Sequence, residues 1–158
     1  MQSCRFFLPS CKKYVIGALK FGGIGMPEKK TIERAKKDKR EGKAPSTQAG
    51  EFVREEMEHI REGKHGARSP EQAIAIGLSK ARRAGVKLAP PKKGTTSEAT
   101  RKKAERDLEK GQSGKTAKPS AKRSKARVQA LKREGRSAAS HKALSKHAKR
   151  AAAVRKRG

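Results

Sequence analysis

The sequence predicts an all-α protein with a small helical hairpin at about residues 46–86 and long basic flanks that are disordered or conditionally helical. Helix start and stop signals bound segments in which apolar residues recur at spacings of three and four. Aromatic residues make up 3% of the chain and Trp is absent, so little apolar surface offsets the entropy of ordering every residue. Lys and Arg number 43 against 15 Asp and Glu, a formal net charge of +28. Such a charge indicates polyanionic partners, of which nucleic acid is the most plentiful.

Composition divides the chain into three parts. An N-terminal extension, residues 1–25, holds four basic residues, no acidic residue and both cysteines; residues 26–90 hold 16 basic and 10 acidic residues; residues 91–158 hold 23 basic and 5 acidic residues. Lysines interrupt the apolar stretches of the extension, which therefore fits neither a secretory signal nor a membrane span. Two interpretations stay open: an organelle transit segment, and an over-long reading frame whose natural start is Met26. The abrupt change in composition favours the second.

The first expected helix starts at Pro27 and ends near Gly42. Proline suits the first helical turn, where its missing amide costs nothing, and Glu28 beside it complements the helix dipole. The apolar side chains along this helix are those of Ile32 and Ala35. We therefore expect the helix to be marginal in isolation.

A second helix is expected after Pro45, with Ser46 or Thr47 as its N-cap and Gly63 at its end. Its apolar stripe has spacings of four and three and consists of Val53, Met57 and Ile60, with Phe52 on the flank. Its acidic residues are interpreted as a solvated face; they are Glu51, Glu55, Glu56, Glu58 and Glu62.

The third expected helix has the clearest signals. Ser69 and Gln72 have the spacing of a capping box, in which Ser69 accepts from the third helical amide and Gln72 reaches back to the Ser69 amide. Pro70 occupies the first helical position, and Gly85 supplies a left-handed stop that Val86 can cover. The apolar stripe consists of Ile74, Leu78 and Ala81, with Ile76 adjacent.

The second and third helices are expected to pack their stripes together as the hairpin, joined by residues 62–68. A core of this size rarely stands alone without a metal ion, a disulfide or a partner. We therefore expect a homodimer, or a protein partner bound through residues 46–86.

Beyond Pro90 and Pro91 the sequence is rich in Lys, Arg, Ala, Ser and Gly. Thr95 with Glu98 resembles another capping box, before a helix that reaches Gly111, and residues 111–119 have the composition of a linker. Residues 120–134 and 137–156 favour helix, but stripes made largely of alanine bury little surface. We expect this tail to be disordered until phosphates neutralise it.

The basic tail predicts a non-enzymatic protein that binds nucleic acid without sequence specificity, DNA more than RNA, by releasing the counterions of the phosphates it neutralises. A protein-interaction adaptor that uses the hairpin is the alternative, and an RNA- or ribosome-associated role stays open. The expected nucleic-acid-binding residues are Lys122, Arg123, Lys125, Arg127, Lys132, Arg133, Arg136, Lys149, Arg150, Arg155, Lys156 and Arg157.

Base-specific readout of DNA is disfavoured. The sequence allows a helix-turn-helix whose cations lie at the end of the third helix; these cations are Lys80, Arg82, Arg83 and Lys87.

No metal site is expected, because the six-residue separation of His59 and His65, and of His141 and His147, fits neither a zinc knuckle nor one helix face. Cys4 and Cys11 lack metal-ligand spacing as well. No phosphate loop or nucleophile motif is present, so we expect no catalysis, cofactor or small-molecule substrate. Bulky apolar residues are too few for membrane insertion.

The stretch from Met26-Pro27-Glu28 through Gln72-Ala73-Ile74-Ala75-Ile76-Gly77-Leu78-Ser79 to Ala81-Arg82-Arg83-Ala84-Gly85 resembles a family of small basic bacterial proteins of unknown function. The resemblance covers about residues 26–90, and the tail is similar to the Lys/Arg/Ala-rich tails of bacterial linker-histone-like proteins. It implies a cytoplasmic, nucleoid-associated, histone-like bacterial protein whose natural start is Met26.

Overall fold

The computed structural model describes residues 26–114 and 120–157, and within them the chain is helical without strands. The all-α prediction is therefore confirmed. The elements in chain order are α1 (Lys29–Arg40), α2 (Pro45–Arg61), α3 (Pro70–Arg83), α4 (Glu98–Ser113), α5 (Ala121–Arg133), a 3-10 turn (Ser137–Ala139) and α6 (His141–Arg157). What was expected of residues 1–25, their two cysteines included, and of most of the 111–119 linker lies outside the described residues.

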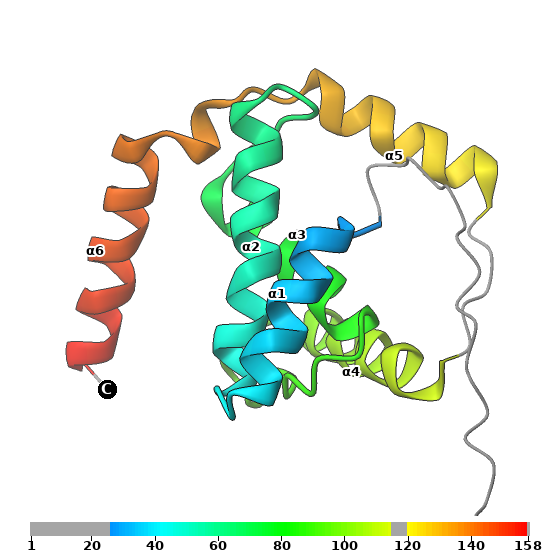
Figure 1. The fold of residues 1–158 in the computed structure, drawn as a ribbon. Helices are drawn as coiled ribbons and strands as arrows, with labels where there is room; N and C mark the ends of the chain where they lie inside the picture. Colours follow the sequence, from blue (N-terminus) through cyan, green and yellow to red (C-terminus); the bar gives the residue numbers. More distant parts are fainter. Residues whose placement is uncertain (1–25, 115–119, 158) are drawn as a thin grey trace, which may run out of the picture.

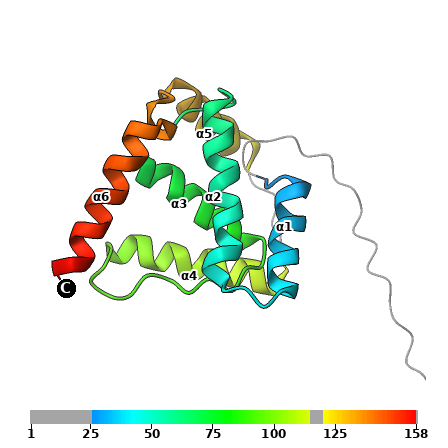
Figure 2. The ribbon, with the colours of Figure 1, turned by 60° about the vertical axis from the view of Figure 1, so that its left-hand side comes forward.

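The centre of the molecule is the pair α2 and α3. Helices α1 and α6 lie on opposite sides of this pair, and α4 crosses beneath α3 (Figures 1 and 2). Gly77 of α3 permits a close approach to α2, because a Cβ atom there would lie 2.7 Å from Val53 Cα. The helices that follow and precede the pair cover it, so the core extends well beyond two helices.

The buried apolar residues form two clusters. One contains Met57, Ile60, Ala67, Ala73, Ala138 and Ala139; the other contains Ala35, Ala49, Phe52, Ala81 and Val86. Phe52, expected on the flank of the stripe, is 1% exposed and central to the second cluster. Alanines dominate both clusters because helices with small side chains at their contacts can pack closely.

Helix α1 is anchored by α2 rather than by its own propensity. Thr31 and Ala35 are buried, and Ile32 packs on the second apolar cluster. Tertiary packing of a narrow face thus supports a helix that is marginal alone.

The helix ends follow the sequence signals in part. The Ser69 hydroxyl accepts a hydrogen bond from the Gln72 amide at 3.3 Å, and Gly85 has a left-handed φ of 92°. Gln72 Oε1, however, accepts from the Arg68 amide at 2.9 Å instead of the Ser69 amide. Gln72 therefore satisfies the amide one residue before the N-cap, and the predicted reciprocal half of the capping box does not form.

Two other predicted caps are wrong. Helix α4 is capped by Ser97, which accepts from the Thr100 amide at 3.3 Å, and the predicted Thr95–Glu98 box does not form. Helix α2 begins at Pro45 itself, so Ser46 and Thr47 lie inside its first turn and Ala44 takes the N-cap position without a side-chain hydrogen bond. Proline at the first helical position explains this start, since it needs no amide partner there.

Residues 131–139, which we call the docking segment, fold back onto the loop between α2 and α3. The Gly66 amide donates to Leu131 O at 2.9 Å and the Ala67 amide donates to Gly135 O at 3.0 Å. A Cβ atom on Gly66 would lie 1.9 Å from Glu134 O, so this approach requires glycine. A part of the chain expected to be disordered alone is therefore described here as packed on the body.

Residues 26–114 form the body of the molecule, and residues 120–157 form the basic segment, which contains the docking segment. Among the helices of these residues, none combines the length and the apolarity that crossing a membrane needs.

Candidate functional site

The predicted nucleic-acid-binding residues lie on α5, the docking segment and α6. Every one of them whose side chain is described is exposed; the Arg157 side chain lies outside the described residues. Lys122, Arg123, Lys125 and Arg127 project around α5 rather than along one face, as expected from the helical repeat. Of the predicted residues with a described side chain, Arg150 alone contacts a carboxylate.

Helix α6 is tied to the body through Glu71, in the first turn of α3. His147 Nδ1 lies 3.0 Å and Arg150 Nη1 lies 3.6 Å from Glu71 Oε1. The backbone amide of Glu71, then His147 and Ser69, lower the pKa of this carboxyl to about 2. The carboxylate therefore stays ionised through the physiological range.

The cations at the end of α3 do not form a DNA-reading surface. Lys80 and Arg82 are 2% and 6% exposed. The Arg82 guanidinium donates to Leu88 O and Ala89 O, at 3.2 and 3.3 Å, and so holds the chain that leaves the helix. Lys80 and Arg82, two of the four residues that suggested a helix-turn-helix, are therefore buried and bonded within the protein.

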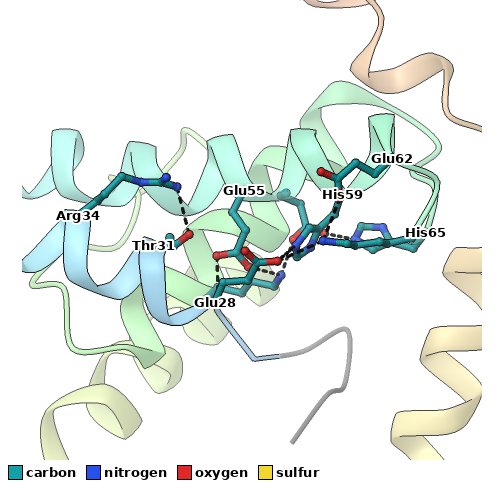
Figure 3. A network of polar contacts seen from close by, with 10 residues as sticks. Glu28, Thr31, Arg34, Glu55, His59, Glu62 and His65 are labelled. Carbon is teal, nitrogen blue, oxygen red and sulfur yellow. Dashed lines mark hydrogen bonds and ion pairs between the residues drawn. The ribbon is translucent and has the colours of Figure 1, made fainter.

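A buried ion cluster lies between α2 and α3 (Figure 3). Lys80 Nζ lies 2.7 Å from Glu56 Oε2 and 3.5 Å from Glu55 Oε1. The side chains of Glu55 and Glu56 are 2% and 0% exposed, so the interpretation of both as part of a solvated face is wrong. Helices α1 and α3 cover α2 from two sides, and they bury Glu55 opposite its apolar stripe and Glu56 beside it.

Two histidines and a further carboxylate extend this cluster towards the surface. His65 Nε2 lies 3.1 Å from Glu56 Oε1, and His59 Nε2 lies 2.9 Å from Glu28 Oε1. Burial opposes the ionisation of Glu56, but His65 and Lys80 outweigh it and lower the pKa of the carboxyl. The Glu56 carboxylate in turn raises the pKa of His65.

Glu56, His59 and His65 are a set of metal-ligand type. One ligand atom of each lies within 4.8 Å of the others, and all three residues are buried. Spacing along the chain could not reveal this set, because His59 lies near the end of α2 and the loop returns His65 to its side (Figure 3). Glu56 and His59 alone carried a signal, as an i, i+3 pair on one helix face.

Comparison of the chain with models of protein families, with curated proteins and with solved structures finds no match.

Proposed function

We propose that the protein binds nucleic acid, DNA in the first place, without sequence specificity and through phosphate neutralisation by the basic segment. Exposed cations without carboxylate partners carry this proposal. The basic segment has 14 Lys and Arg and one acidic residue, Glu134. Cations that are not already neutralised within the protein are those that can replace the counterions condensed on phosphates.

The placement of α5 and α6 supports binding by two separate arms. They lie on different sides of the α2–α3 pair (Figure 1). At 13 and 17 residues, they are roughly 20 and 25 Å long at 1.5 Å per residue. Because cations surround α5, it is suited to contact phosphates from several directions rather than to enter one groove. This arrangement favours bridging or compaction of duplexes, and with the bacterial resemblance of residues 26–90 we place the proposed role at the nucleoid.

The basic segment should be tested by substitution rather than by truncation. Removing everything after Pro90 would also delete α4, which packs on α3, and Ala138 and Ala139 of the first apolar cluster. A loss of binding could then reflect a loss of folding. Gln keeps the helix propensity of Lys and Arg and removes only the charge.

The test compares two variants with the same loss of charge. One is K122Q/R123Q/K125Q/R127Q on α5, and its matched control is K29Q/K30Q/K36Q/K39Q on α1, whose four lysines are also exposed. We expect the α5 variant to flatten the slope of log affinity against log salt by up to roughly 3–4 on duplex DNA, because each phosphate contact contributes about 0.9. The α1 variant should leave the slope close to that of the wild type.

Equal slopes for both variants would show that net charge alone governs binding, and no binding of DNA by the wild type would overturn the proposal. Tighter binding of duplex RNA than of DNA would reassign the target to the RNA alternative.

The adaptor hypothesis receives no comparable support. The apolar side chains that suggested it, such as Ile74 and Leu78, pack on the two clusters inside the molecule. The large apolar side chains exposed among the described residues are Met26 and Val154, which lie at opposite ends of the chain outside the hairpin.

A further inference from the structure

The position of His65 favours a proton or a metal ion at its Nε2 atom. Its Nδ1 atom lies 3.1 Å from Gly66 O, and a carbonyl oxygen can only accept, so the proton of the neutral ring belongs on Nδ1. Nε2, which then carries a lone pair, lies 3.1 Å from Glu56 Oε1. Two lone pairs at this distance repel each other unless a proton or a metal ion lies between them.

The geometry around Nε2 is that of neighbouring ligands more than that of a hydrogen bond. His65 Nε2 and Glu56 Oε1 are both buried and lack an aligned hydrogen-bond partner among the described residues. Atoms bound to one zinc ion at 2.0–2.2 Å lie about 3.3–3.6 Å apart in a tetrahedral site, slightly more than the 3.1 Å between these two atoms. A backbone carbonyl that accepts from the other ring nitrogen is also the usual support of a metal-binding histidine.

A third ligand and the local charge complete the case. His59 brings a ring nitrogen within 4.8 Å of the other two ligand atoms. Glu55 and Glu56 both contact Lys80. Glu28 contacts His59 at the outer edge of the cluster (Figure 3), and Lys64 pairs with both Glu28 and Glu62, at 3.2 and 2.9 Å. With both imidazoles neutral, the buried carboxylates of Glu55 and Glu56 exceed the charge of Lys80 by one, so the site keeps a net negative charge that favours a cation.

We propose that Glu56, His59 and His65 bind a divalent metal ion of the zinc type. Two imidazoles and one carboxylate are a ligand set that zinc accepts, with a fourth position left for water or a further carboxylate. Glu28, at 2.9 Å from His59, brings a carboxylate to the outer edge of the set.

A route for the ion exists beside His65. A groove of about 770 Å³ runs between the α2–α3 loop and the docking segment, and His65 is one of its lining residues, with Lys64, Gly66, Lys132 and Arg136. The bound ion would fasten this loop to α2. Because Gly66 and Ala67 donate to Leu131 and Gly135, the ion would also fix the α2–α3 loop on which the basic segment packs.

The experiment measures zinc retained by the full chain after dialysis against metal-free buffer, with circular dichroism to verify folding. We expect one equivalent per wild-type chain and a loss of more than about tenfold in affinity for H59Q and H65Q, since even outer-shell partners are worth 10–100-fold. The matched control is H141Q/H147Q, because these exposed or half-buried histidines have the same six-residue spacing. A second control, C4S/C11S, removes the other zinc-binding side chains of the sequence.

Several outcomes decide the proposal. It is overturned if the folded wild type retains no zinc, or if either control loses zinc as H65Q does. If H65Q does not fold, H59Q is compared with the wild type instead, and the absorption spectrum of Co²⁺ bound to the wild type reports the coordination geometry directly. An intense tetrahedral Co²⁺ spectrum that zinc displaces supports the site, whereas a weak octahedral one contradicts it. An unloaded wild type whose His65 ring carries two protons by NMR identifies a buried imidazolium–carboxylate pair instead.

Discussion

The body and the basic segment hold positive charge in opposite ways. Residues 26–114 contain 23 basic and 14 acidic residues, and several pairs among them are buried or half-buried, such as Lys80 with Glu56 and Arg83 with Asp107. Residues 120–157 contain one acidic residue, and those of their cationic side chains that the structure describes are exposed. The difference shows that total charge does not distinguish the two uses of charge in this chain: many cations of the body are paired within it, whereas those of the segment are mostly unpaired, as the proposed binding of nucleic acid requires.

The largest effect is expected from Lys80→Met, which breaks the charge balance inside the body. It would leave Glu55 and Glu56 buried without their cation, and removal of one member of a buried pair costs about 3–5 kcal/mol. Urea unfolding followed by circular dichroism in metal-free buffer would measure the loss. Lys36→Met on α1 is the control, since an exposed lysine should change stability by less than about 0.5 kcal/mol. Similar stabilities for the two variants would mean that the Lys80 cluster is not ionised.

An intermediate loss of stability is expected from Gly66→Ala, which disrupts the contact between the α2–α3 loop of the body and the docking segment. The new Cβ atom would lie 1.9 Å from Glu134 O, and such overpacking costs about 1–3 kcal/mol. The docking segment should detach while the helices of the body stay folded. Hydrogen exchange would record this as faster exchange of the amides at positions 66 and 67, which lose their acceptors, and of residues 131–157. Gly50→Ala is the control, because no atom lies within 4 Å of its Cβ position, and it should stabilise α2 by about 0.5–1 kcal/mol. Unchanged exchange in Gly66→Ala would contradict the docking contact.

The smallest effect is expected from Glu71→Gln, which weakens the exposed contact between α3 and α6. The pKa of Glu71 is lowered to about 2 from an ordinary value of 4.5, so its ionised form is the one that the fold favours. The contact is therefore fully present above pH 4.5 and is lost as the pH falls through about 2. Hydrogen exchange of α6 amides should show this acid-dependent loosening in the wild type and not in the variant. Glu109→Gln, an exposed residue of α4, should keep the wild-type pH dependence.

Local signals in the sequence were sufficient to predict where the helices lie along the chain, but not how the helices contact one another. Pro70, Ser69 and Gly85 act within one turn, so α3 was predicted almost to the residue. The burial of Glu55 and Glu56 depends on α1 and α3 covering both sides of α2, which the sequence of α2 alone does not specify. His65 is equally non-local, because its position depends on the path of a loop.

The basic residues were predictable for the opposite reason. An exposed cation on an alanine-rich helix needs no tertiary partner, so composition alone identified Lys122 to Arg127 as accessible. Composition did not predict that this segment packs on the body. Ala138 and Ala139 are ordinary helix formers by composition, and the turn that precedes α6 brings them into the core.

The two backbone hydrogen bonds from Gly66 and Ala67 to Leu131 and Gly135 also set an order of events on the ribosome. At a synthesis rate of about 5–20 residues per second, the acceptor carbonyls emerge roughly 3–14 s after the amides that bind them. Helices α1 to α4 have that interval to assemble, whereas contacts between distant parts of a chain form late in any case. The nascent body therefore has time to close its internal ion pairs before most of the polycation has left the ribosome, so that the newly made cations meet carboxylates that are already paired.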